Sequence, residues 1–214
     1  MPQGVLPYQY QEETSSAGMT ALAGLPIYLD LAQAAGLSES SQRHVKLREG
    51  KQGWSDAQMI TSLVLLNLAG GDAVEDLEIL EKDEGFGQVL RRVEHHGLAR
   101  KERRALERRW RKQRQRTVPS PSAVFRYLAE YHNAAAEQRR QPHQAFIPAP
   151  NPALRGLGKV NADLAAFVQG QSPQRVAILD QDATLVETRK KEALYCYQGK
   201  PISPCAPTGR NRAW

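Results

Sequence analysis

Cysteines and long apolar runs are scarce or missing in this 214-residue sequence, and each shortage excludes a class of protein. Its two cysteines, Cys196 and Cys205, do not suggest a disulfide framework, and a pair alone cannot supply the four ligands of a zinc site. No run of about 18 uncharged apolar residues occurs, so we expect no membrane span. The first residues, 1–4, lack the basic and apolar regions of a signal peptide. We therefore expect a protein of the reducing cytoplasm.

Sequence patterns of metal-dependent proteases and nucleotide-binding loops are also missing. The five histidines are scattered and form no H-E-x-x-H pattern or paired Cys–His spacing. No lysine follows Gly70-Gly71-Asp72 in the spacing of a P-loop, so we interpret the two glycines as the end of a helix.

Positive charge, by contrast, is concentrated in one segment. The chain carries a net charge of +6. Residues 91–116 contain twelve Lys and Arg against three Glu, a local charge of +9, so the remainder carries −3. Such a local excess is typical of a surface that binds a polyanion.

Helical spacing of apolar residues and capping residues predict a series of short helices in the first 140 residues. The first spans Thr20–Ala35, where Pro26 marks a bend or the true start, and a second begins at Ser38. Ser55 is the expected N-cap of the most apolar helix, which ends at Gly70-Gly71. Further helices are expected after an Asp72 cap up to a break at Gly85–Gly87, and over residues 98–116, 122–133 and 158–168.

The pattern changes in the last third of the chain. Pro142–Pro152 holds four of the 13 prolines and is interpreted as a linker. Arg175–Asp180 has the apolar composition of a buried strand, Thr184–Glu187 continues it, and Ala193–Tyr197 is a second strand candidate. Two strands alone cannot form a stable sheet, and the tail from residue 201 shows no strand pattern.

Two carboxylates, Asp180 and Asp182, lie at the end of the predicted strand. Alternation points both to the same face, where like charges repel unless a cation or a shared proton relieves them. Mg²⁺ fits this pair, since it prefers oxygen ligands and is often held by one or two carboxylates and a substrate phosphate. The alternative is a pair of surface acids at a strand-to-turn junction.

The basic segment is the second candidate site. In a helix over residues 98–116, cations would cover most of the circumference, which suits contacts to a phosphate backbone. The residues we expect there are Arg103, Arg104, Arg108, Arg111 and Lys112. The alternative is a solvated, charged helix packed on a small bundle.

The segment after the basic residues resembles the second half of a helix-turn-helix. Ser120 or Ser122 can cap a helix in which Pro121 occupies the first turn, and Ser122 and Arg126 would then contact base edges in the major groove. The residues expected on the apolar side of this helix are Val124, Phe125, Leu128 and Tyr131.

Four segments together resemble the insertion-sequence transposases of the DDE type, the group described as transposase DDE domain group 1. They are Trp54–Asp72, Ala73–Leu80, Val118–Leu128 and Leu179–Thr184, and the resemblance extends to about Gly199. Their combination in this order is far more specific than any one of them.

The resemblance implies an α+β protein, with a mostly helical DNA-binding region followed by the first strands of a truncated ribonuclease-H-like α/β domain. It assigns residues 1–140 to DNA binding, 141–158 to a linker and 159–214 to the start of the catalytic domain. Its partners would be double-stranded DNA at the terminal inverted repeats of the element and, when the protein is intact, a second copy.

In this family three acids and two Mg²⁺ ions cut and join DNA by in-line displacement at phosphorus. The first acid maps onto Asp182, which Thr184 follows in the family's manner, with Asp180 close behind.

The second Asp and the Glu of the family should lie far downstream, beyond this chain. A set of codons can be chosen for residues 201–214. When the same nucleotides are read with one extra nucleotide in front, they encode Ala-Tyr-Gln-Pro-Leu at the start, which is a continuation typical of the family. We therefore interpret the tail as the product of a frameshift after Lys200, and the chain as a truncated, inactive fragment.

Two other functions fit part of the sequence. A helix-turn-helix regulator would use the same basic region, with the acids merely structural. A haloacid-dehalogenase-like phosphohydrolase also carries a strand followed by D-x-D-x-T, as in residues 180–184, but its domain needs many more residues than the chain has after Asp182.

Overall fold

The computed structural model describes residues 5–7, 19–48, 53–113, 116–139, 149–173, 176, 194–195 and 201–202. For residues 109–113, 134, 137, 194–195 and 201–202 it describes the backbone alone. The chain divides into two units, one made of residues 1–131 and 152–172, the other of residues 132–151 and 173–214. No helix in the described part is long and apolar enough to cross a bilayer.

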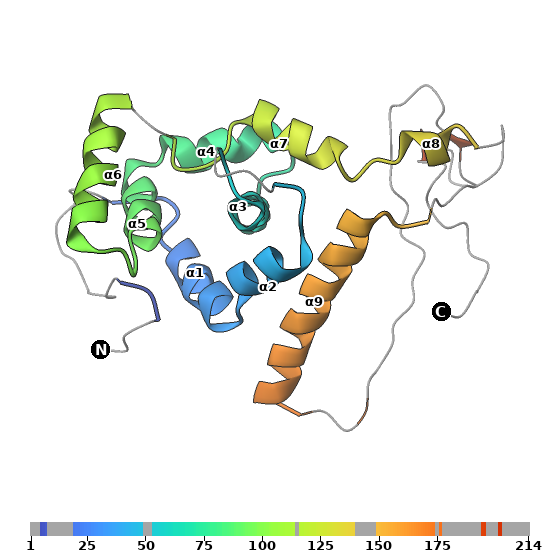
Figure 1. The fold of residues 1–214 in the computed structure, drawn as a ribbon, viewed down its shortest axis with the longest axis horizontal. Coiled ribbons are helices and arrows are strands. Elements are labelled where there is room, and N and C mark those ends of the chain that lie inside the picture. Colours follow the sequence, from blue (N-terminus) through green and yellow to red (C-terminus); the bar gives the residue numbers. More distant parts are fainter. Residues whose placement is uncertain are drawn as a thin grey trace. The chain divides into compact units, whose positions relative to one another are not determined.

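The first unit is helical, as the sequence predicts (Figure 1). Its elements are α1 (Leu25–Ala34), α2 (Leu37–His44), α3 (Asp56–Leu68), the 3-10 helix η1 (Val74–Asp76), α4 (Leu77–Lys82), α5 (Glu84–Glu94), α6 (Arg100–Gln113), α7 (Pro121–Ala129) and α9 (Pro152–Gln171).

In the second unit the described elements are α8 (Ala134–Glu137) and two short strands, β1 (Leu194–Tyr195) and β2 (Pro201–Ile202). The strands pair antiparallel, with Leu194 opposite Ile202 and Tyr195 opposite Pro201. The prediction that the tail has no strand is therefore wrong at these two residues. The strands expected over 175–180 and 184–187 lie, apart from Val176, outside the described residues.

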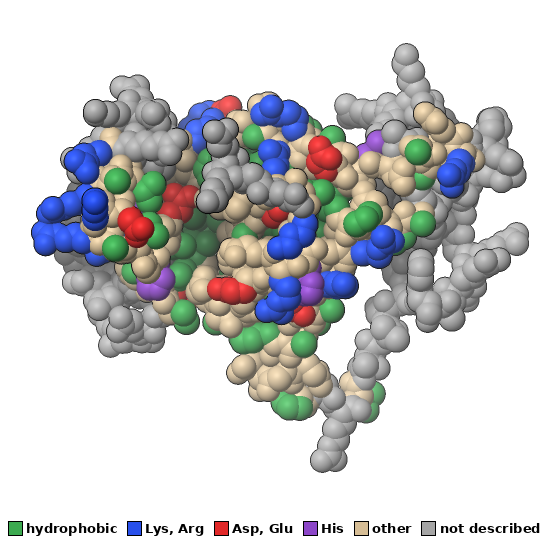
Figure 2. Space-filling view, in the orientation of Figure 1, with side chains coloured by type: hydrophobic (Ala, Val, Ile, Leu, Met, Phe, Trp, Pro, Cys, Tyr) green, Lys and Arg blue, Asp and Glu red, His purple; other side chains and the backbone are tan. Residues whose placement is uncertain are grey.

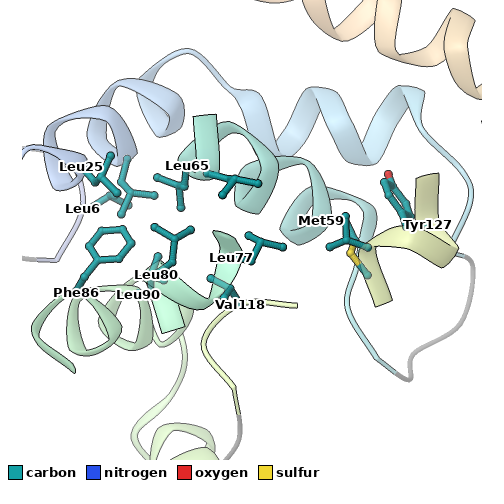
Figure 3. Close-up of a cluster of buried hydrophobic side chains, with 13 residues drawn as sticks. Leu6, Leu25, Met59, Leu65, Leu77, Leu80, Phe86, Leu90, Val118 and Tyr127 are labelled. Atoms are coloured by element: carbon teal, nitrogen blue, oxygen red, sulfur yellow. The ribbon is translucent and has the colours of Figure 1, made fainter. Parts of the chain in front are cut away.

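Two apolar clusters form the core of the helical unit. The larger one joins α1, α3, α4, α5 and α7, and Figure 3 shows its side chains pointing toward one another between these helices. Its buried members are Leu6, Leu25, Leu29, Met59, Leu65, Leu66, Leu77, Leu80, Phe86, Leu90, Val118, Val124 and Tyr127. The smaller cluster, of Leu37, Val45, Ile60 and Val160, lies between α2, α3 and α9.

Local capping chemistry sets the start of α3, as predicted. The Ser55 hydroxyl accepts the Gln58 N–H at 3.2 Å, and the Gln58 side chain accepts the Ser55 N–H at 2.9 Å. This reciprocal pair satisfies two N–H groups that the first turn leaves unpaired. Pro26 lies in the first turn of α1, so that helix starts at Leu25 and not at Thr20.

Two predicted helix boundaries are wrong. Asp72 caps no helix; the Asp76 carboxylate instead accepts the N–H groups of Asp72 and Ala73, and η1 forms there. The break expected at Gly85–Gly87 falls at Asp83, because Phe86 is fully buried and must lie within α5 to reach the core.

Asp83 ties the start of α5 to the segment before α1. Its carboxylate accepts hydrogen bonds from the Phe86 N–H, the Thr20 hydroxyl and the Ala21 N–H, at 2.7–3.0 Å. Burial alone would raise the pKa of Asp83, but these donors together hold its pKa below the usual value.

The helix α9 is longer than the predicted helix over 158–168 and packs against α2 in the helical unit. The Asp163 carboxylate accepts the Ser40 hydroxyl at 2.6 Å and lies 3.1 Å from His44 Nε2 and 3.7 Å from Arg43. The Ser40 hydrogen bond, followed by His44 and Arg43, lowers the pKa of Asp163. Residues 152–158, expected in the linker, form the first turns of this helix.

The packing of α9 on α2 predicts opposite effects for two glycines of α9. A Cβ at Gly156 would lie 2.4 Å from the His44 carbonyl oxygen, whereas a Cβ at Gly158 would meet nothing within 4 Å. We expect Gly156→Ala to lower the free energy of unfolding by about 1–3 kcal/mol through this backbone clash. Gly158→Ala is the matched control and should raise it by about 0.5–1 kcal/mol, because alanine favours a helix. Urea unfolding of both variants measures this difference, and equal midpoints would contradict it.

Candidate nucleic-acid interface

The helix α6 projects basic side chains into solvent along its described length. Every described side chain from Arg100 to Arg108 is exposed, including the predicted Arg103 and Arg104. The spacing of four residues between Arg100, Arg104 and Arg108 places these three on one face. Figure 2 shows Lys and Arg gathered there, at the left of the view.

This basic face borders an open hollow of about 500 Å³, lined by Arg100, Lys101, Arg104, Glu107 and Arg108. Glu102 accepts the Ala99 N–H at 3.0 Å and so caps the helix. Within the described residues, no carboxylate forms an ion pair with a cation of α6. Arg111 and Lys112 lie in the last turn of α6, where only the backbone is described.

A glutamate on α4 fixes the turn that precedes α7. The Glu81 carboxylate accepts hydrogen bonds from the Thr117 N–H and hydroxyl at 2.9 Å and from the Val118 N–H at 3.2 Å. Thr117 and Val118 are buried, so water can replace Glu81 as their acceptor only in part. The turn that leads into α7 is therefore held by a residue 36 positions earlier in the sequence.

The helix α7 begins as predicted, and Ser120 is its N-cap. The Ser120 hydroxyl accepts the Ala123 N–H at 3.3 Å, and Pro121 occupies the first turn. Ser122 and Arg126, the two predicted base contacts, are both exposed. The Arg126 Nε donates to the Ser122 carbonyl at 3.3 Å, which places its side chain along the first turn.

The predicted apolar side of α7 needs correction. Val124 and Tyr127 are the buried residues, at the spacing of three that suits one helix face. The sequence predicts Phe125 and Leu128 beside Val124, but they are 50% and 38% exposed. Phe125 therefore lies next to Arg126 on the solvent side, where an aromatic ring is available to a partner.

A group of residues around Tyr127 has no counterpart among the predicted sites. Asp56, 6% exposed, accepts the N–H groups of Leu47 and Arg48 at 3.2 and 3.0 Å. The Arg48 guanidinium lies 5.9 Å from the centre of the Tyr127 ring. Tyr131 donates a hydrogen bond of 3.0 Å to the Tyr127 hydroxyl. These residues come from separate segments of the chain, so no local pattern indicates that they meet.

Burial determines the protonation of this group. The pKa of the Tyr127 hydroxyl is raised far above its usual range, mainly by burial, with further contributions from the neighbouring Tyr131 hydroxyl and the charge of Asp56. Burial also raises the pKa of Tyr131. Both hydroxyls are thus neutral at any physiological pH and act here as hydrogen-bonding groups.

Asp180 and Asp182, the predicted catalytic and Mg²⁺-binding residues, lie outside the described residues. Within the described part of the chain, no group of three or more His, Cys, Asp or Glu is placed to hold a metal ion. A larger hollow among the described residues of the helical unit, of about 1170 Å³, has Trp54, Gln58 and Glu94 in its lining. Burial raises the pKa of Glu94, whose carboxylate accepts a hydrogen bond from Gln58.

Comparisons of this chain with protein-family models, with curated proteins and with solved structures found no match. The resemblance to insertion-sequence transposases therefore stays a prediction from the sequence.

Because Glu81 holds the turn before α7, we expect its removal to loosen that turn. In Glu81→Ala, two N–H groups and the Thr117 hydroxyl lose their acceptor, which should lower the free energy of unfolding by about 2–3 kcal/mol. Glu78→Ala on the same helix is the control, since Glu78 is exposed and its carboxylate forms an ion pair with Lys82. Hydrogen exchange at Thr117 and Val118 should quicken in the first variant alone. Unchanged exchange there would contradict the role given to Glu81.

Proposed function

We propose that this chain binds double-stranded DNA through α6 and α7, as the end-binding part of an insertion-sequence transposase of the DDE type. The observation that carries the proposal is the row of exposed cations on α6, for which no carboxylate partner lies among the described residues. Phosphate oxygens of DNA are the ligands that such a row suits.

The second support is the exposed side of α7. A capped helix with Ser122, Phe125 and Arg126 in solvent offers a hydroxyl, an aromatic ring and a guanidinium to base edges. Arginine pairs with the acceptors of guanine in the major groove, and an apolar side chain contacts the thymine methyl group. In this arrangement α6 binds the phosphate backbone, and α7 recognises the base sequence.

DNA cutting and joining belong to the proposal on the resemblance alone. They are assigned to Asp182 and Asp180 with Mg²⁺, which would supply charge stabilisation at the reacting phosphate together with the family's two later acids.

The charge of α6 predicts the salt dependence of DNA binding. We expect the triple variant Arg103→Gln, Arg104→Gln, Arg108→Gln to bind a duplex more weakly, because three phosphate contacts are lost. The slope of log K against log salt concentration should become shallower by about 2.7, at about 0.9 for each contact. Fluorescence anisotropy at several salt concentrations measures both quantities.

The matched control removes the same charge from exposed positions outside α6 and α7, in the triple variant Lys82→Gln, Arg139→Gln, Lys159→Gln. This variant should keep a slope close to that of the unmodified chain. Equal slopes for the two triple variants would reject α6 as the phosphate-binding helix.

The DNA on either side of the gene tests the transposase assignment itself. We expect inverted repeats there, and tighter binding to a duplex of one repeat than to a shuffled duplex. Phe125→Ala should lower this preference, because an apolar contact with a thymine methyl group is lost, and leave binding to shuffled DNA unchanged. A preferred site in a promoter would instead indicate a helix-turn-helix regulator.

A further inference from the structure

We infer that Arg48 is a second phosphate-binding residue for the same DNA, held beside α7 by Asp56 and Tyr127. This inference rests on the proposed function, since it assumes that α7 lies against a duplex. It adds to that function a basic contact from the loop after α2, which lies outside the basic stretch of residues 91–116.

Arg48 is positioned at two points, although it belongs to a loop. The backbone N–H of Arg48 donates to the buried Asp56 carboxylate at 3.0 Å. Its guanidinium lies over the Tyr127 ring, 5.9 Å from the ring centre. Arginine in a loop ordinarily samples many rotamers, and ordering it on binding costs conformational entropy. Here much of that cost is met in the free protein, so more of the contact energy would appear as affinity.

The stacked arrangement leaves the hydrogen-bonding groups of Arg48 available. The N–H groups of a guanidinium lie in its plane, so a ring below that plane does not occupy them. Arg48 is exposed, and within the described residues no carboxylate pairs with it. Arg43, on the helix before it, differs, because it lies 3.7 Å from Asp163 and is partly neutralised.

The place of Arg48 suits a duplex that α7 contacts. Tyr127 is a buried residue of α7, and Arg48 covers its ring from the solvent side, so the guanidinium lies at the edge of α7. In Figure 1, α6 lies at the left end of the helical unit, to the left of α3. The loop after α2 lies to the right of α3. A helix in the major groove has a phosphate backbone on each side. Arg48 and α6 would bind phosphates on different sides of α7.

Arg48→Gln and Arg48→Lys test the inference in the full chain with one duplex as the probe. Glutamine should weaken binding several-fold and make the salt slope shallower by about 0.9, the change expected for one phosphate. Lysine keeps the charge and should keep the slope. Both variants should unfold at the midpoint of the unmodified chain, because the side chain is exposed. Lys82→Gln is the single-charge control.

A double-mutant cycle tests the role of Asp56. Asp56→Asn alone should weaken DNA binding, but it should have little further effect when Arg48 is already Gln, because Asp56 acts through Arg48. The Arg48 variants decide the inference whether or not the Asp56 variant folds. If the unmodified chain binds DNA with a steep salt slope but Arg48→Gln behaves like Lys82→Gln, the inference is overturned and the proposed function stands. If the unmodified chain shows no salt-dependent DNA binding, the proposed function fails first.

Discussion

Backbone N–H groups held by inward-facing carboxylates are the constraint on which the helical unit depends. Asp83 joins the start of α5 to the segment before α1, Glu81 holds the turn before α7, and Asp56 holds the loop after α2. Hydrogen bonds to a charged acceptor are stronger than neutral ones, and each of these acids accepts at least two. Short helices such as α4 and α7 would gain little from their own hydrogen bonds, so these contacts and the shared core fix their positions.

This use of the acids has an electrostatic consequence at the surface. Carboxylates that accept N–H groups inside the fold are not available to pair with arginines outside it. The cations of α6 from Arg100 to Arg108, and Arg48, face solvent without a carboxylate partner among the described residues, although the chain has 23 acidic residues against 29 basic ones. The positive charge is therefore denser on this surface than the net charge of +6 alone implies, as the DNA binding that we propose would require.

Local chemistry could be predicted from the sequence, and contacts between distant segments could not. The Ser55 and Ser120 caps and the exposed cations of α6 follow from residues within a few positions of one another. The helix break lies at Asp83 and not at the glycines, because burial of Phe86 outweighs glycine propensity. The apolar residues of α7 are spaced so that either of two helix faces could be buried. Packing of Val124 and Tyr127 into the core selects one face, and Phe125 lies on the other. The contacts of Arg48 could not be predicted from its neighbours in the sequence, since Asp56 and Tyr127 reach it from other elements.

The surface that we propose binds DNA also depends on a helix that comes after the proline-rich segment. Val160 of α9 completes the small cluster with Val45 and Ile60, and Val45 lies at the start of the loop that carries Arg48. Asp163 of α9 accepts the hydroxyl of buried Ser40 on α2, the helix from which that loop emerges. A fragment that ends at residue 140 would leave Val45 and Ile60 open to water and Ser40 without its acceptor. Residues 152–171 therefore belong to the unit that presents α6, α7 and Arg48, and their role is to hold that surface in place rather than to act as a linker.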